Sequence, residues 1–303
     1  MAFDATDGRV REGSARTPGQ ARVQAHVHRA SVHKAADGEV LLGDAVQLEG
    51  GRFVLALRWH RDHFLGHRGG GAAGDPLLLA EAVRQAAIHL SHRFYAVPGD
   101  HAFILCDLHL ERDGELPAGG PDAAPLVMEA TFTPMGRGRR FDMRMAAEVF
   151  QDGRRVARGG MRWMAVDRAR YATLRLRGTT HACVEDIRPV LPPGPPADRD
   201  RLVERVAPNA WRLRIDPAHP VLFDHGCDHI PGMVLMEAVR QVGAALRPEH
   251  ARPAAIESAF HSFGELDTDT TLTSRQLADG VVEVTVAQGA RTLASISLAG
   301  AAC

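Results

Sequence analysis

The sequence predicts an α+β protein built from two tandem copies of one unit. Both halves of the 303-residue chain contain the pattern DHxxxH followed by LxEAVRQ, in the same order. Two separate multi-residue matches in one order indicate a duplicated sequence. In each half, one long segment with apolar residues at helical spacing is followed by several strand-like segments, as expected when an antiparallel sheet packs on a single helix.

The elements of the first half follow from local patterns. An alternating segment at 52–59 is typical of a half-buried strand. A helix is expected over 76–94, where apolar side chains recur at helical spacing. Pro76 suits its first position, because the missing N–H is not needed there. Further strands are expected at 103–110, 126–133, 141–150 and 155–166.

The second half repeats this order in a shorter segment. A helix is expected over 232–246. Strands are expected after it, at 254–263, 270–277, 281–288 and 292–298. The two EAVRQ blocks, which begin at Glu81 and Glu237, therefore occupy equivalent places on the two helices.

Composition divides the chain into four segments. Residues 1–22 contain few large apolar side chains, which predicts a disordered leader. Residues 188–201 are rich in proline, which disfavours helix and stiffens the chain, and we expect a linker there. The first repeat is then expected over 23–187 and the second over 202–303.

Charge and cysteine content argue against several classes of function. The formal net charge is −1, so the chain has no bulk attraction to nucleic acid or to an anionic membrane. No stretch approaches the ~20 consecutive apolar residues of a membrane span. The four cysteines include no CxxC pair, and the N-terminal segment lacks the apolar run of a secretory signal. A cytoplasmic location is expected.

A series of short motifs runs in order along nearly the whole chain. They are Val32-His33-Lys34, Glu39–Leu42, Asp75–Glu81, Leu90–Tyr95, Thr133–Arg137, His219–His225 and Pro231–Met233. The series resembles the A-factor biosynthesis (AfsA-type) family of actinobacterial proteins. The resemblance implies two hotdog folds in tandem, each a curved antiparallel sheet wrapped around one long central helix.

The same resemblance implies an activity. Members of this family transfer a β-ketoacyl group from acyl carrier protein to the hydroxyl of dihydroxyacetone phosphate, an early step toward γ-butyrolactone, butenolide or furan signalling molecules. More distantly, the segment from His225 through Pro231-Gly232 to Glu237 is similar to the active-site segment of β-hydroxyacyl-ACP dehydratases. In those enzymes a histidine, a Pro-Gly pair and a helical glutamate face an acyl thioester.

Two glutamates stand in apolar stretches of the expected helices. An unpaired buried charge is costly, so Glu81 and Glu237 each need a partner or have a function. We expect burial to raise their pKa toward the range of a general base, and either one to accept the proton of the acceptor hydroxyl. The alternative is a structural ion pair with Arg84 or Arg240, three residues further along each helix.

The residues that follow the glutamates have predicted roles as well. Arg84 or Arg240 is expected to anchor the acceptor or its phosphate. Gln85 and Gln241, four residues after the glutamates, are expected to orient the carboxylates.

The DHxxxH segments supply further candidates. Each precedes a helix whose N-terminal N–H groups are suited to hold a developing oxyanion, and a histidine there can shuttle a proton. We predict His225 as catalytic and His63, His67, His229 and Asp224 as substrate-binding. The alternative is that these Asp–His pairs cap the helices or satisfy loop groups.

Arginines after a predicted turn form another candidate cluster. Arg137, Arg139 and Arg140 are placed to hold a substrate phosphate or the phosphopantetheine phosphate. A solvated hairpin tip is the alternative interpretation.

Some residues suggest chemistry without specifying it. Cys227 precedes a helix, where a thiolate nucleophile would be stabilised. Its counterpart in the first copy is Leu65, so the duplicated unit does not require sulfur there, and direct attack by the acceptor hydroxyl is the expected route. The HxxxH spacing binds zinc only on one helix face, and the flanking Gly and Pro predict loops, so no metal is expected. His89 and His92 are expected to be surface or interface residues.

The sequence therefore predicts a cytoplasmic acyltransferase that acts with acyl carrier protein and a small phosphorylated acceptor. The only prosthetic group expected is the phosphopantetheine carried by that partner, and the protein is either a monomeric pseudo-dimer or a homodimer. A hotdog dehydratase or thioesterase is the alternative enzyme. An acyl-ligand-binding regulator is the alternative outside enzymes, although neither a helix-turn-helix nor a basic stripe is visible.

Overall fold

The computed structural model describes residues 27–65, 73–120, 123–135, 141–178 and 199–301. These residues form one twelve-stranded sheet in the order β1-β2-β4-β5-β6-β3-β9-β12-β11-β10-β8-β7. The strands are β1 (Leu42–Gln47), β2 (Arg52–Leu57), β3 (Ala102–Arg112), β4 (Leu126–Pro134), β5 (Phe141–Gln151), β6 (Arg154–Val166), β7 (Val203–Ala207), β8 (Ala210–Leu213), β9 (Ala255–Phe260), β10 (Thr271–Gln276), β11 (Val282–Gln288) and β12 (Arg291–Ala299).

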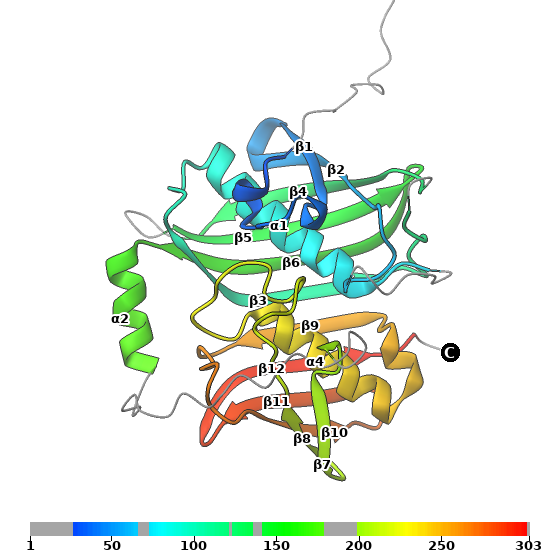
Figure 1. Ribbon diagram of the computed structural model, residues 1–303. Helices are drawn as coiled ribbons and strands as arrows, with labels where there is room; N and C mark the ends of the chain where they lie inside the picture. The colour runs from blue at the N-terminus through cyan, green and yellow to red at the C-terminus, as the bar shows by residue number, and fades with distance from the viewer. Residues whose placement is uncertain (1–26, 66–72, 121–122, 136–140, 179–198, 302–303) are drawn as a thin grey trace, which may run out of the picture.

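The helices are fewer than the strands in the described part. The α-helices are α1 (Pro76–Phe94), α2 (Arg168–Gly178) and α4 (Gly232–Leu246), and the 3-10 helices are η1 (Arg29–Val32), η2 (Asp37–Glu39), η3 (Glu49–Gly51) and η4 (Pro248–Ala251). In Figure 1, α1 lies along the strands of the first half and α4 along those of the second. The predicted α+β class with tandem hotdog folds is confirmed, because each half wraps its antiparallel strands around one long helix.

The two halves share a continuous sheet at β3 and β9. These strands pair antiparallel, with Asp107 opposite Ala259 and Glu111 opposite Ala255. The buried hydroxyl of Ser258 also donates to the carbonyl of Leu108 across this seam, at 2.6 Å. The pairing fixes the halves against each other, and α1 and α4 are in contact on the sheet.

The two central helices begin differently. Pro76 occupies the first turn of α1, as predicted, and the carboxylate of Asp75 caps the helix by accepting from the N–H of Leu77 at 2.9 Å. In α4, Pro231 is the N-cap residue and no side chain caps the helix. The first N–H groups of α4 are therefore not used by a capping side chain.

Other parts of the fold were not predicted. No sequence pattern specified β1, β7, β8 or α2, because these elements are short or lack a clear apolar stripe. Residues 1–22 and most of 188–201 lie outside the described residues, so the boundaries expected for the leader, linker and repeats stay predictions. Among the described helices, none has both the length and the hydropathy to span a bilayer.

Candidate active site

Both central helices carry the same buried Glu–Arg pair. In α1, Nε and Nη2 of Arg84 donate to the two carboxylate oxygens of Glu81, each at 2.8 Å. In α4, Arg240 binds Glu237 in the same bidentate manner, at 2.8 and 2.7 Å. Both carboxylates are fully buried. The structure thus contains the ion pairs that the sequence left as an alternative to a general base.

A glutamine on each helix connects the ion pair to the segment just before the first strand of its half. Nε2 of Gln85 donates to Oε1 of Glu81 at 3.0 Å and to the carbonyl of Glu39 at 2.8 Å, while its Oε1 accepts from the N–H of Leu41 at 2.8 Å. Gln241 makes the same contacts in the second half, with Glu237, Asp200 and Leu202. Each glutamine therefore holds its carboxylate in a fixed orientation.

The expectation that burial raises the pKa of Glu81 is wrong. Burial alone acts in that direction, but the charges of Arg84 and Lys34, together with hydrogen bonds from Arg84 and Gln85, hold the pKa of Glu81 well below its usual range. Nζ of Lys34 lies 3.2 Å from Oε1 of Glu81. Because Arg84, Gln85 and Lys34 already occupy this carboxylate, Glu81 is not placed to take the proton of an acceptor hydroxyl.

A cavity of about 490 Å³ lies between the two halves. Its wall is largely apolar and comes from both copies, with contributions from Phe103, Met164, Leu174, Met233 and Phe260. Such a wall suits an acyl chain, because burying apolar surface is the main source of affinity for a chain of this kind.

Polar residues from both copies meet at this cavity. Of the predicted site residues, Glu81, Arg84, Asp224, His225 and His229 line it. His225 of the second copy therefore shares a cavity with Glu81 of the first copy, whereas Glu237, in its own repeat, does not line this cavity. At this cavity the histidine and the Pro-Gly pair of the dehydratase-like segment are thus joined by Glu81 of the first copy instead of Glu237.

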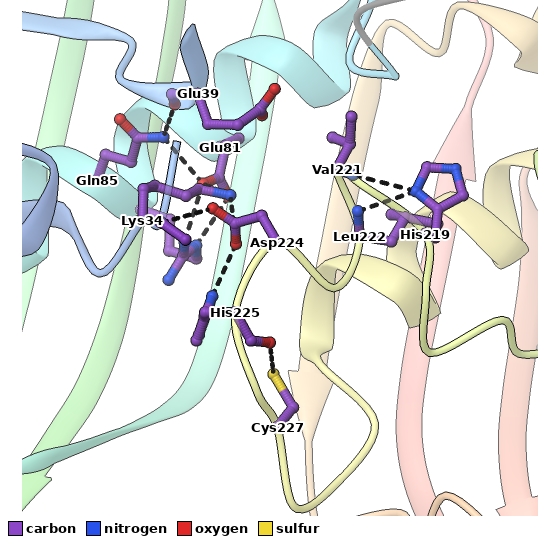
Figure 2. A network of polar contacts seen from close by, with 12 residues as sticks. Lys34, Glu39, Glu81, Gln85, His219, Val221, Leu222, Asp224, His225 and Cys227 are labelled. Carbon is purple, nitrogen blue, oxygen red and sulfur yellow. Dashed lines mark hydrogen bonds and ion pairs between the residues drawn. The ribbon is translucent and has the colours of Figure 1, made fainter. Parts of the chain in front are cut away.

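Lys34 connects the two copies at the cavity, as Figure 2 shows. Besides Glu81, its Nζ approaches Oδ1 of Asp224, at 3.8 Å. Asp224 accepts a hydrogen bond from Nδ1 of His225 at 2.7 Å and another from the N–H of Ala35 at 3.0 Å. The aspartate thus fixes the orientation of the His225 ring and leaves Nε2 as the ring nitrogen without this partner.

The environment of His225 favours its charged form. The hydrogen bond to Asp224 is the largest cause that raises the pKa of His225 to about 9, with a further contribution from Cys227 and partial opposition from burial. His225 is therefore an imidazolium at neutral pH and has a proton to donate.

A second histidine at the cavity, His33, is held in its neutral form. Burial is the largest cause that lowers the pKa of His33 to about 3, and electrostatic interactions with His92, Arg84 and His225 act in the same direction. Nε2 of His33 lies 2.9 Å from Nε2 of His92. At neutral pH His33 is therefore neutral and His225 cationic, and both line the cavity.

The sequence matches a known domain over most of its length. The A-factor biosynthesis hotdog domain, AfsA, matches residues 15–167 and 204–303. The chain belongs to the AfsA family. The resemblance inferred from the motifs is confirmed.

Relatives in this family have a named activity. The 2-oxo-3-(phosphooxy)propyl 3-oxoalkanoate synthase of Streptomyces virginiae is 36% identical over 251 residues, covering 80% of this chain and 84% of that protein. The proteins of the same name from Streptomyces griseus and Streptomyces coelicolor are each 30% identical, covering 77% and 80% of this chain and 80% and 79% of their own lengths. These relatives are synthases, which supports an enzymatic function for this AfsA-family chain.

Solved structures agree with the fold. An acyl-ACP thioesterase from Bacteroides thetaiotaomicron superposes with a TM-score of 0.53 at 13% identity, covering 84% of this chain and 99% of that one. The 12:0-ACP thioesterase from Umbellularia californica superposes with a TM-score of 0.50 at 11% identity, covering 84% and 98%. At this identity the likeness concerns the fold alone.

Arg84 and Arg240 of this AfsA-family chain differ in how many of their side-chain nitrogens have hydrogen-bond partners. Arg240 uses a third nitrogen, since its Nη1 donates to the carbonyl of Ala251 at 3.0 Å. Nη1 of Arg84 has no hydrogen-bond partner among the residues described, and Arg84 lines the cavity. Arg84 therefore presents an unused nitrogen to an anionic ligand in the cavity, whereas every side-chain nitrogen of Arg240 already has a partner and Arg240 does not line the cavity.

The start of α4 also presents donors to the cavity. Gly232 and Met233 line it, and their N–H groups have no partner within the described ranges. Helix N-terminal N–H groups bind anionic oxygens. The matching end of α1 is capped by Asp75 instead, so the N-termini of the two helices are not equivalent.

The other predicted histidines have local contacts. Nδ1 of His63 accepts from the N–H of Leu65 at 3.0 Å, and its Nε2 lies 3.6 Å from Oδ2 of Asp75, which fits the loop-satisfying alternative. Nδ1 of His229 contacts Oδ1 of Asp228 at 2.7 Å. The remaining predicted site residues, His67, Arg137, Arg139 and Arg140, lie outside the described residues.

Sequence reasoning assigned no role to two residues that line this cavity, His33 and Lys34. The signal that could have selected them is the single lysine of the chain standing next to a histidine. The expectation that His89 is a surface or interface residue is wrong, because His89 is buried with Nδ1 3.1 Å from Oγ of Ser31. His92 is half-buried and contacts His33, because this face of α1 packs on η1.

The remaining candidates for chemistry at the site are the thiol of Cys227 and a metal ion. Sγ of Cys227 donates to the carbonyl of His225 at 3.4 Å. Within the described ranges, no group of three or more His, Cys, Asp and Glu side chains is arranged to hold a metal ion.

Proposed function

We propose that this chain is an acyltransferase that moves a β-ketoacyl group from the thioester of acyl carrier protein to a hydroxyl of dihydroxyacetone phosphate. The proposal agrees with the name of its Streptomyces relatives. The observation that carries it is the apolar cavity at the seam, where the free Nη1 of Arg84, the cationic His225 and the uncapped start of α4 meet.

The thioester occupies the cavity with its carbonyl at the start of α4. The N–H groups of Gly232 and Met233 hold the oxygen, which becomes an oxyanion when the carbonyl is attacked. The apolar wall then receives the acyl chain, including Met164, Leu174 and Phe260.

His225 supplies the proton for the leaving group. When the C–S bond breaks, the thiolate of phosphopantetheine needs a proton, and the imidazolium of His225 can donate it from Nε2. Asp224 keeps the ring in the orientation that this requires.

Arg84 binds the acceptor phosphate. Its Nε and Nη2 are engaged with Glu81, so the free Nη1 donates to a phosphate oxygen while the ion pair fixes the guanidinium plane. Glu81 in this assignment is a positioning residue rather than the base expected from sequence, because Arg84, Lys34 and Gln85 already contact its carboxylate.

Product analysis tests the proposal. Purified protein is mixed with a β-ketoacyl thioester of acyl carrier protein and dihydroxyacetone phosphate, and the products are separated and weighed by mass spectrometry. We expect a phosphorylated β-ketoester that forms only when the acceptor is present. Release of free β-keto acid at the same rate with and without the acceptor would instead identify a thioesterase, and an unsaturated thioester formed from a β-hydroxyacyl substrate would identify a dehydratase.

A further inference from the structure

The hydrogen bonds of two histidines determine where His33 carries its lone pair. Nδ1 of His92 lies 2.8 Å from the carbonyl oxygen of Val97. A carbonyl only accepts, so the proton of a neutral His92 is on Nδ1 and its Nε2 is an acceptor. That acceptor lies 2.9 Å from Nε2 of His33. Nε2 of His33 must then be the donor, and Nδ1 of His33 carries the lone pair.

This lone pair is not used by the protein. His33 lines the cavity, and Nδ1 has no hydrogen-bond partner in the part of the chain that is described. Phe103 packs against the ring edge-on, with centroids 5.0 Å apart, and helps to fix its plane. Because the pKa of His33 is lowered to about 3, the ring stays neutral and the lone pair stays available over the working pH range.

The backbone holds His33 in an uncommon conformation. His33 ends η1 with φ 54° and ψ 51°, in the left-handed region, and its N–H donates to the carbonyl of Ala30. A non-glycine residue in this region costs free energy, and such strain is concentrated at functional sites. The turn places His33 and Lys34 side by side at the cavity.

We propose that Nδ1 of His33 binds the nucleophilic hydroxyl of the acceptor and takes its proton during acyl transfer. The inference rests on the function proposed above and assigns the base that Glu81 does not provide. His33 and His225 then form an acid–base pair at one cavity, one ring presenting a lone pair and the other a proton.

The step balances as follows. The hydroxyl oxygen attacks the thioester carbon, a C–O bond forms, and the hydroxyl proton passes to Nδ1 of His33. The tetrahedral oxyanion is held by the N–H groups at the start of α4. The C–S bond then breaks, and the thiolate leaves with the proton of His225. Proton transfer from His33 to His225 through solvent restores both rings, and the products are one ester and one thiol.

Two substitutions at one position test the role. Glycine accepts the left-handed conformation without strain, so His33→Gly removes the ring and spares the backbone. Asparagine also tolerates this conformation and places an amide oxygen near the position of Nδ1. His109→Asn is the matched control, because His109 is exposed on β3 and does not line this cavity.

We expect His33→Gly to lower kcat for ester formation by about 100-fold or more and to raise KM for dihydroxyacetone phosphate. Binding of a non-hydrolysable β-ketoacyl thioester analogue should stay within about twofold of the native value. His33→Asn should recover about tenfold of the lost rate. His109→Asn should match the native protein.

Three results would overturn the assignment. Ester formation at the native rate by His33→Gly would exclude His33 as the base and leave the proposed function intact. A loss of thioester binding as large as the loss of rate would indicate a structural role and would also exclude His33 as the base. No ester from the native protein would reject the proposed function and this role together. Nitrogen NMR shifts of the His33 ring give a readout free of activity: we expect a bare Nδ1 and a protonated Nε2, and the opposite tautomer would exclude Nδ1 as the base.

Discussion

Lys34 and Asp224 form an ion pair that joins the two halves of the chain. Nζ lies 3.8 Å from Oδ1, and the two side chains are 6% and 3% exposed. Because Lys34 also pairs with Glu81 at 3.2 Å, one ammonium stabilises a carboxylate from each copy. The only lysine of the chain therefore links Glu81 of α1 to the loop that carries His225.

Removing this ammonium should destabilise the fold. In Lys34→Met, two buried carboxylates lose one cationic partner, and we expect the free energy of unfolding to fall by roughly 2 kcal/mol. The loss stays moderate because Glu81 keeps Arg84. Denaturation by urea measures it. Arg29→Gln is the control, since its pair with Asp37 is exposed and should contribute no more than about 0.5 kcal/mol. Equal effects of the two substitutions would contradict the role of Lys34.

The two buried glutamates should differ in function but not in stability. Glu81→Gln and Glu237→Gln each leave a buried arginine without its counter-charge, so both should destabilise by about 3 kcal/mol. Per folded molecule, Glu237→Gln should keep near-native turnover because Glu237 does not line the cavity. Glu81→Gln should lose about 100-fold, since Arg84 and Lys34 are displaced. Steady-state rates, measured at temperatures below the unfolding transitions of both variants, test this. A large loss of turnover in Glu237→Gln alone would place the active site in the second copy.

Local patterns were sufficient to predict most of the fold. The helical spacing of apolar residues placed α1 and α4 at their observed bounds, and alternation placed most strands within a few residues. The duplication required both halves to share one architecture, and the equivalent contacts of Gln85 and Gln241 follow from it.

The site could not be predicted to the same extent, because it depends on contacts between distant segments. The pairing of β3 with β9 decides that His225 shares a cavity with Glu81. The pKa of Glu81 is lowered mainly by Arg84, which the helical spacing placed beside it, and also by Lys34, which no helical pattern connects to it. The role inferred for His33 depends on a left-handed turn and on the carbonyl of Val97.

The pH dependence of turnover should follow His225. Its pKa is raised to about 9, so the acid is protonated below that pH, and kcat/KM should fall as the pH rises through about 9. The groups around it include Asp224 and Cys227, which favour the cation, and the cationic Lys34 and Arg84 on the first-half side of the cavity.

Asp224→Asn removes the hydrogen bond that contributes most to the raised pKa of His225. The pH at which activity falls should therefore move toward about 6.5. Because the pKa of His225 is higher in the folded state than in the unfolded state, its protonated ring stabilises the fold. This stabilisation is complete below about pH 6.5 and decreases as the pH rises through about 9. Rates and urea midpoints between about pH 6 and about pH 10 measure both effects. A turnover that is level across this range would exclude His225 as the acid.

The position of α2 should set the acyl chain length that the enzyme accepts. Tyr171 donates to Asp228 at 2.7 Å and Arg175 pairs with Glu265 at 2.7 Å, so the helix is fixed to the second half, and Leu174 between them lines the cavity. A larger side chain there should shorten the apolar space.

We therefore expect Leu174→Trp to lower kcat/KM for long-chain β-ketoacyl thioesters by about tenfold and to leave short chains unchanged. Leu176→Trp is the matched control on the same helix, because Leu176 is 74% exposed and points away from the lining. A panel of thioesters of increasing chain length measures the selectivity. If Leu174→Trp slowed all chain lengths equally, the acyl chain would not reach α2, and its wall would have to be sought among the residues of α4 and β9.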